Sequence, residues 1–278
     1  MFFLILAIFS SAMVAIIMRT AQTKVSNPTG LLAGNYIVCV LMGLLLSVPE
    51  IRAGAFPGFP FSIGLGILNG GIYLGSFALM QWSTRQNGVV LSSMFMKLGV
   101  LVSTLISIVF FREIPTLLQV LGFFLAVCSI LIINYTPGVA FSRSSWVLIV
   151  MLVVSGLTDV MSKIYEVFGN AALENTFLLF TFFSGLCLCL VFMKRKQEHL
   201  GKQELFYGAL LGIPNFLSSL FLLKALSSVP AMIAFPTFNV AVILIVAFAG
   251  MLLFRERLSR KQAAGGLLIC IALVLLNL

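Results

Sequence analysis

Two twelve-residue stretches decide the fold of this chain: FREIPTLLQVLG at Phe111–Gly122 and FRERLSRKQAAG at Phe254–Gly265. Both begin with Phe-Arg-Glu, and both carry Gln at the ninth position and Gly at the twelfth. The same offset of 143 residues pairs further positions without a gap: Leu74 with Leu217, Ser76 with Ser219, Leu79 with Leu222 and Phe95 with Phe238. Self-similarity at one offset indicates an internal repeat. We therefore expect two copies of one unit, over residues 1–138 and 139–278, joined in a single compact membrane body.

The composition is that of a membrane protein. Of the 278 residues, 61% are hydrophobic and only 9% are charged, whereas soluble domains are about 25% charged. A helix needs about 20 apolar residues to cross the hydrocarbon core. Ten runs of this kind are present: 2–18, 30–49, 60–83, 89–111, 117–134, 145–164, 174–193, 205–226, 231–254 and 260–277. The runs lack the alternation of transmembrane strands, so we predict an all-α integral membrane protein with ten transmembrane helices.

The end of each repeated stretch predicts a helix start. Thr116 and Gln119 have the S/T-x-x-Q spacing of a capping box, and Ser259 and Gln262 repeat it. Each box is expected to open a helix just outside the bilayer. Glu113 and its counterpart Glu256 are then expected to close a tight interfacial turn rather than to contact a solute.

Five spans in each repeat imply that the second repeat crosses the membrane in the opposite sense to the first. Two inverted five-helix repeats are the architecture of carriers that work by alternating access, with the solute near the midplane. Transport of a small-molecule substrate is therefore the function that the residue pattern favours.

Basic residues are unevenly divided between the two ends of the predicted spans. One end holds twelve, namely Arg19, Lys24, Arg85, Arg143, Lys194, Arg195, Lys196, Lys202, Arg255, Arg257, Arg260 and Lys261. The other holds four, namely Arg52, Arg112, Lys163 and Lys224. Cytoplasmic loops carry the excess of Lys and Arg, which places both termini outside. The net charge of +9 is thus assigned to orientation beside the lipid bilayer, and nucleic acid is not expected as a partner.

Two charged residues fall inside apolar runs, Lys97 in the fourth and Asp159 in the sixth. Charge at the bilayer centre costs at least about 2.5–3.5 kcal/mol, so it usually faces a cavity or a partner. We hypothesise that Lys97 faces a central cavity and either pairs with Asp159 or holds an anionic group of the solute. Two plainer readings stay open: Lys97 extends to the near interface, and Asp159 lies at an interface beside Lys163.

Other polar or helix-weakening residues lie at matching depths in the two repeats. Pro214 aligns with Gly71 of Asn69-Gly70-Gly71, and Pro236 aligns with Ser93; weakened helices expose backbone groups to a solute. The predicted solute-binding set is Asn35, Asn69, Tyr73, Ser93, Lys97, Asp159, Asn215, Pro236 and Asn239. Five glycines are instead expected to let helices pack closely: Gly43, Gly64, Gly66, Gly99 and Gly185.

Catalytic and metal-binding patterns are not found in the sequence. The single histidine, His199, lies in a basic loop, and the five cysteines all fall inside apolar runs, where they are expected to be small hydrophobic residues. No P-loop, HExxH or cofactor motif occurs, so neither metal nor cofactor is expected. A membrane-embedded enzyme acting on a lipid or head group is the alternative function, and a non-transporting scaffold is a third.

The duplicated aromatic-x-Glu, polar cap, Gln and Gly resembles the EamA-like branch of the drug/metabolite transporter superfamily over nearly the whole chain. The chain departs from that family at Arg112 and Arg255, where Gly is common, and at Ser93, where a mid-helix Pro is frequent. The resemblance implies a secondary carrier in the cytoplasmic membrane that exports amino acids, metabolites or drugs, through a cavity lined by spans one, three, four, six, eight and nine. It also implies cytoplasmic termini, against the charge count. Substrate, direction, coupling ion and oligomeric state stay open.

Overall fold

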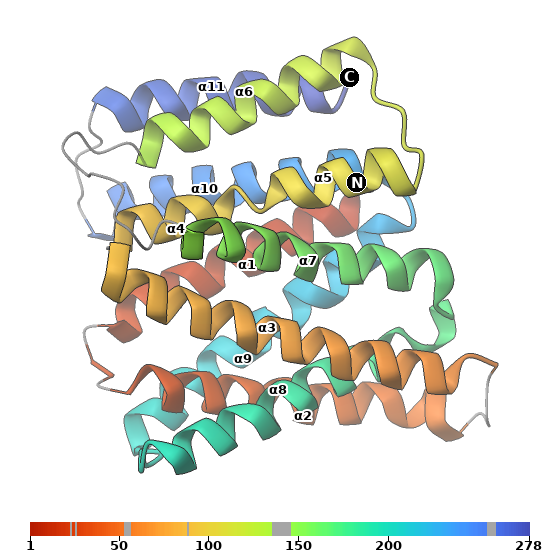
Figure 1. The fold of residues 1–278 in the computed structure, drawn as a ribbon, viewed down its shortest axis with the longest axis vertical. Helices are drawn as coiled ribbons and strands as arrows, with labels where there is room; N and C mark the ends of the chain where they lie inside the picture. Colours follow the sequence, from red (N-terminus) through yellow and green to blue (C-terminus); the bar gives the residue numbers. More distant parts are fainter. Residues whose placement is uncertain (23, 26, 53–56, 88, 135–145, 255–259) are drawn as a thin grey trace. The chain divides into compact units, whose positions relative to one another are not determined.

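The computed structural model of the chain describes all residues except 23, 26, 53–56, 88, 135–145 and 255–259. Its described part contains helices and turns but no strand (Figure 1). Eight helical segments are long and apolar enough to cross a membrane, and two shorter apolar helices, Leu117–Ile133 and Ala263–Leu276, complete the predicted ten. The prediction of an all-α membrane protein is confirmed.

The elements follow the predicted runs closely. Their bounds are α1 Phe2–Gln22, α2 Pro28–Arg52, α3 Phe59–Asn87, α4 Val89–Lys97, α5 Val100–Phe110, α6 Leu117–Asn134, α7 Trp146–Phe168, η1 Ala171–Leu173, α8 Glu174–Arg195, α9 Lys202–Leu226, α10 Ala231–Phe254 and α11 Arg260–Leu276. The helices α4 and α5 together make the fourth span. By contacts the chain divides into a first unit, Met1–Leu74 with Met161–Ser227, and a second unit, Gly75–Val160 with Ser228–Leu278. Each unit therefore draws helices from both sequence repeats, and the division at 138/139 stays a prediction.

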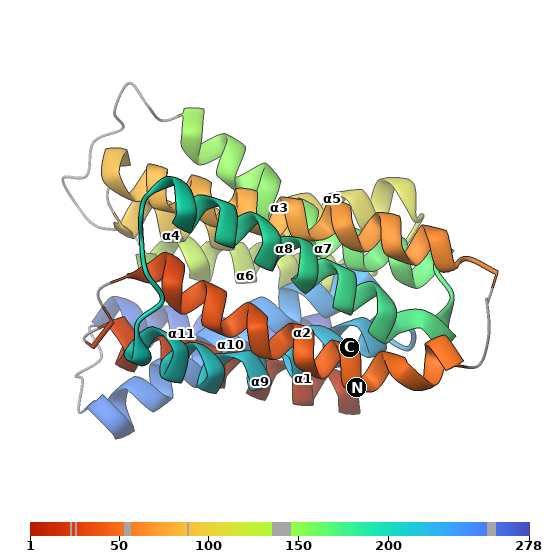
Figure 2. The same ribbon diagram turned by 90° about the horizontal axis from the view of Figure 1, so that it is seen from below.

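Glycines hold the helices of the first unit close together. In this unit α2 packs against α8 and α9, and α9 also packs against α1 (Figure 2). A Cβ atom added at Gly208 would lie 2.7 Å from the Gly34 Cα atom, and one at Gly212 would lie 2.6 Å from the Val38 Cβ atom. Without a hydrophobic drive between helices in lipid, such close approach is a main source of helix association.

The five glycines predicted to pack helices differ in their surroundings. A Cβ at Gly43 would lie 3.0 Å from the Leu179 Cα atom, and one at Gly66 would lie 2.7 Å from the Phe177 carbonyl oxygen. Gly185 faces the Tyr36 ring, and Gly99 contacts α7. A Cβ added at Gly64 would meet no atom of another helix within 4 Å in the described part of the chain. The packing prediction is thus wrong for Gly64, because that position opens away from the neighbouring helices.

In the second unit, α6 and α11 lie side by side (Figure 1), and α10 packs against α5, α6 and α11. The glycines of the two repeated stretches lie in the α6–α11 contact. A Cβ at Gly122 would lie 2.9 Å from the Leu276 amide nitrogen, and one at Gly265 would overlap the Ile133 side chain. The twelfth position of each stretch is therefore glycine because two equivalent helices cross there at close range.

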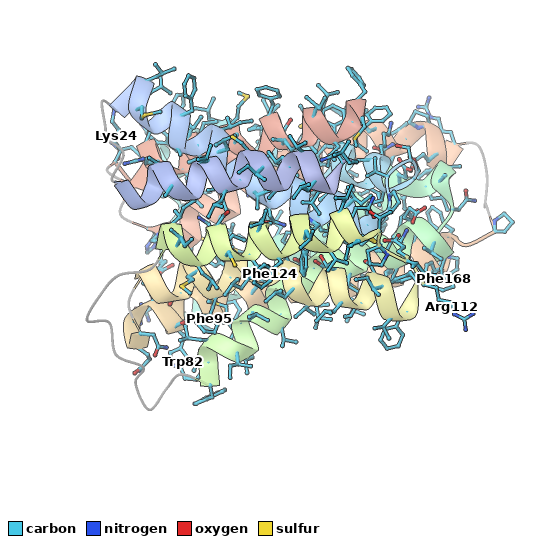
Figure 3. The ribbon with its side chains drawn as sticks, turned by 90° about the horizontal axis from the view of Figure 1, so that it is seen from above. Lys24, Trp82, Phe95, Arg112, Phe124 and Phe168 are labelled. Atoms are coloured by element: carbon cyan, nitrogen blue, oxygen red, sulfur yellow. The ribbon has the colours of Figure 1, made fainter. Side chains whose placement is uncertain are left out.

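The first repeated stretch, Phe111–Gly122, contains the residue that caps the N-terminus of α10. Arg112 has φ +55°, a left-handed conformation that turns the chain, and its exposed side chain points away from the helices (Figure 3). The Glu113 carboxylate then accepts hydrogen bonds from the Ala231 and Met232 amides, at 3.0 and 2.8 Å. A carboxylate is favourable at a helix N-terminus. Glu113 thus caps α10 instead of only closing its own turn, and Glu256 lies outside the described residues.

The capping box that follows is confirmed. The Thr116 amide donates to Gln119 Oε1 at 3.0 Å, and the Gln119 amide donates to Thr116 Oγ1 at 3.3 Å. The reciprocal pair satisfies two of the four amides that a helix N-terminus leaves without partners. The second predicted box involves Ser259, which lies outside the described residues.

The fourth span is interrupted, but not at the predicted place. A turn at Leu98–Gly99 separates α4 from α5, whereas the sequence pattern points to Ser93. Gly99 lies directly against Ser155 and Gly156 of α7, so close backbone packing within this unit sets the position of the break. Pro214 and Pro236, the matching helix-weakening residues, lie inside the continuous helices α9 and α10.

Candidate functional site

The nine predicted solute-binding residues divide between the two units. The first unit holds Asn35, Asn69, Tyr73 and Asn215, and the second holds Ser93, Lys97, Asp159, Pro236 and Asn239. The two groups differ in what their side chains contact.

In the first unit, Asn35 and Asn215 are joined across the α2–α9 contact. The Asn215 side-chain amide donates to Asn35 Oδ1 at 3.3 Å. The Cys39 thiol lies between the helices and donates to Asn35 Oδ1 at 3.6 Å and to the Gly212 carbonyl at 3.3 Å. Buried polar groups are costly unless they are hydrogen-bonded. In this cluster a hydrogen bond between the two side-chain amides joins α2 to α9.

A group of aromatic rings packs in the same unit as this amide cluster. The Tyr36 and Tyr73 rings lie 6.0 and 6.5 Å from the ring of Phe182, which lies 5.9 Å from that of Phe216. Tyr36 and both phenylalanines are buried, and Tyr73 keeps partial exposure. Sequence reasoning missed Phe182 and Phe216, since phenylalanine in an apolar run gives no signal in a chain with 26 of them. Tyr73 thus carries its hydroxyl at the edge of a packed aromatic group.

Asn69 is the most enclosed of the predicted residues in this unit, with 2% of its surface exposed. Its Nδ2 donates to Thr181 Oγ1 at 3.4 Å, while its Oδ1 is buried and has no partner among the described residues. The neighbouring Gly70 lies against Thr181 and Ser184 of α8. Asn69 therefore lies in the contact between α3 and α8.

In the second unit, the helix α7 that carries Asp159 is joined to the end of α4 by a hydrogen bond. The Ser155 hydroxyl on α7 donates to the Met96 carbonyl at 3.0 Å. One turn later on α7, Asp159 lies near Ser103 of α5, whose hydroxyl donates to the Val100 carbonyl at 3.2 Å. Sequence reasoning missed both serines as neighbours, although a hydroxyl in an apolar span is a weak signal of this kind. The carboxylate therefore keeps acceptor capacity for a proton or a solute group.

Lys97 is the last residue of α4, directly before the turn. Its side chain is partly buried and has no ion-pair or hydrogen-bond partner among the described residues. In particular, no ion pair joins Lys97 to Asp159, so the pairing branch of the hypothesis does not describe this conformation. Lys163 is paired instead with Glu166, at 2.6 Å.

The remaining predicted residues lie on α4 and α10. Ser93 is partly buried on α4, one turn before Lys97. Pro236 is buried within α10, and one turn later the Asn239 side-chain amide donates to the Phe235 carbonyl at 3.0 Å. The Asn239 amide is thus bonded within its own helix, next to the position where Pro236 lacks a backbone N–H donor.

Comparison with known proteins gives two matches that follow the repeat. Residues 1–135 and residues 143–278 each match the EamA-like transporter family. The chain is also 24% identical over 275 residues to an uncharacterized protein of Haemophilus influenzae, with 94% of this chain and 92% of that protein covered.

The fold is similar to that of a protein of known crystal structure. The TM-score is 0.78 at 14% sequence identity, and the superposition covers 99% of this chain and 98% of that one. At this identity the likeness concerns the fold alone.

Proposed function

The chain belongs to the EamA-like transporter family, and on that premise we propose that it exports small organic solutes across the cytoplasmic membrane by alternating access. Metabolites, amino acids and drugs are the candidate solutes. The observation that carries the proposal is the family match in two copies, because paired inverted repeats provide the two conformations that a carrier needs.

Lys97 is proposed to hold an anionic group of the solute. It is a charge within a membrane span that lacks a partner among the described residues. An unpaired intramembrane charge is costly, and a charge-assisted hydrogen bond to a solute anion offsets that cost. Lys97 precedes the α4–α5 turn, where a shift of the helix would carry the ammonium group with it.

Asp159 is proposed to couple export to a proton gradient. Its carboxylate lies within the sixth span, with the Ser103 hydroxyl of α5 nearby. In the proposed cycle, Asp159 binds a proton from one side of the membrane and releases it on the other as the solute moves in the opposite direction. A hydroxyl can donate to an ionised carboxylate and accept from its protonated form, so Ser103 is suited to both states of Asp159 in this cycle.

The test is efflux from proteoliposomes loaded with defined pools of amino acids, organic anions and lipophilic cations, with and without a pH gradient. The proposal expects one chemical class to leave faster under the gradient. Asp159→Asn, which cannot lose a proton, is expected to keep solute exchange at equal concentrations while losing the response to the gradient. Gradient-driven efflux that persists in Asp159→Asn would contradict proton coupling at this residue, and failure of every pool with folded protein would count against the carrier.

A further inference from the structure

A cavity of about 450 Å³ lies in the first unit, where the α1–α2 connection meets the α8–α9 connection. Its volume is in the range of small-ligand pockets. Six residues line it: Asn27, Pro28, Glu198, His199, Gly201 and Glu204. None of them belongs to the predicted solute-binding set.

Two helix N-termini open on this cavity. Asn27 caps α2, because its Oδ1 accepts from the Thr29 and Gly30 amides at 3.0 Å each. Its Nδ2 donates to the His199 carbonyl at 3.4 Å and so ties the two connections together. Gly201 is the N-cap of α9 and supplies no side-chain cap. The walls are therefore fixed by hydrogen bonds, with the positive ends of two helices at the opening.

One wall of the cavity is acidic. Glu198 Oε2 is buried and has no hydrogen-bond partner among the described residues, and Oε1 lies 3.9 Å from the Lys196 ammonium. Glu204 is buried in the first turn of α9, with its carboxylate against Gly201. A buried carboxylate oxygen without a donor is unfavourable. The Glu198 side chain is 29% exposed, so a ligand ammonium can reach it and supply the N–H donor that Oε2 lacks.

The rim around the acidic wall is basic. Exposed cations lie at the end of α8, in the connection and at the start of α9: Lys194, Arg195, Lys196 and Lys202. Lys24, also exposed, lies in the α1–α2 connection (Figure 3). These exposed cations lie close in sequence to the carboxylates that line the cavity, and ammonium and guanidinium groups are the donors that suit a phosphate.

The cavity also lies between the ends of two candidate membrane spans. Large apolar side chains are exposed beside it, with Phe206 64%, Leu205 44% and Leu200 38% accessible. The spans Ala171–Lys196 and Lys202–Leu226 end and begin there. Phospholipid head groups occupy this depth, and the apolar side chains would meet the upper part of the acyl chains.

We infer that the cavity binds the head group of phosphatidylethanolamine, a zwitterionic membrane lipid. The ammonium group donates to Glu198, the phosphate contacts Lys196 and Lys202, and the acyl chains lie along Leu205 and Phe206. Phosphatidylcholine has the same charges but no N–H donor, and phosphatidylglycerol has the phosphate but no cation. The assignment does not depend on the transported solute.

The test is a lipid series with matched acyl chains added to the purified, delipidated chain in detergent. Thermal unfolding and native mass spectrometry report stabilisation and retained lipid. Phosphatidylethanolamine is expected to bind at least about fivefold more tightly than phosphatidylcholine, and Glu198→Gln is expected to reduce this preference to below about twofold. Glu174→Gln, at the opposite end of α8, is the control and is expected to keep the preference.

The Lys196→Gln variant distinguishes the contact to the phosphate from the contact to the ammonium group. It is expected to weaken binding of phosphatidylethanolamine and phosphatidylcholine equally, because it removes a phosphate contact common to both. Equal binding of these two lipids by the wild-type chain would overturn the assignment even if no variant folded. So would a phosphatidylethanolamine preference that survives Glu198→Gln, or stronger binding of phosphatidylglycerol that depends only on the basic rim.

Discussion

The amide cluster of the first unit is joined by hydrogen bonds, whereas the two charged residues inside spans of the second unit lack comparable partners. Asn35, Cys39 and Asn215 are linked by hydrogen bonds between α2 and α9. Lys97 has no ion-pair or hydrogen-bond partner among the described residues, and the hydroxyl near Asp159, that of Ser103, donates to the Val100 carbonyl. Since unsatisfied charge in a membrane is retained at a cost, the contrast separates residues that hold helices together from residues that we propose meet the solute.

The largest expected effect comes from breaking the packing on which the first group depends. Gly208→Leu places a side chain where the Gly34 Cα atom and the Leu31 carbonyl oxygen both lie 2.7 Å away from a Cβ. Overpacking costs about 1–3 kcal/mol or more, and α2 and α9 cannot separate without losing the amide cluster. Size-exclusion chromatography is expected to show loss of monodisperse protein. Gly64→Leu, at an open position, is the matched control and is expected to elute as wild type.

A second comparison concerns two carboxylates, Glu50 and Glu113, that differ in the number of hydrogen bonds they accept. Glu50 accepts four hydrogen bonds from Asn175 and Thr176, at 2.6–3.2 Å, whereas Glu113 accepts two from Ala231 and Met232. Glu50→Ala is expected to lower unfolding stability by about 2–4 kcal/mol, and Glu113→Ala by about 1–2 kcal/mol. Thermal unfolding measures both. Arg52→Ala at an exposed position beside Glu50 is the control, and a larger loss for Glu113 would contradict the ranking.

A smaller effect is expected within the amide cluster itself. Asn215→Ala removes a donor to Asn35 and Cys39 and is expected to lower unfolding stability by about 1 kcal/mol. If the cluster only holds helices together, the transport KM of the folded fraction stays unchanged. A raised KM at unchanged stability would move Asn215 from the packing group to the solute-binding group.

The sequence predicts more of the fold than of the site. Helix positions follow from apolar runs, and the Thr116–Gln119 box follows from local spacing. The partner of Glu113 lies 118 residues away in the chain, and Asn35 lies 180 residues from Asn215. Such contacts depend on which helices meet, which neither periodicity nor spacing specifies.

The break in the fourth span shows the same limit. Ser93 aligns with Pro236, so local reasoning places the weak point there. The turn forms instead at Leu98–Gly99, because Gly99 packs against Ser155 and Gly156 in the same unit. Lys97 was identified from its charge alone, but that it ends a helix directly before the turn could be known only from the structure.

The most direct test of the contrast is the efflux rate of Lys97→Ala and Lys97→Arg in proteoliposomes, at equal amounts of folded protein and with thermal unfolding measured in parallel. The account predicts that efflux of an anionic solute falls at least about tenfold in Lys97→Ala, the loss of one charge-assisted hydrogen bond. Lys97→Arg keeps more of the rate, and neither variant loses stability. Efflux at the wild-type rate in Lys97→Ala, or a loss that only follows the amount of folded protein, would contradict it.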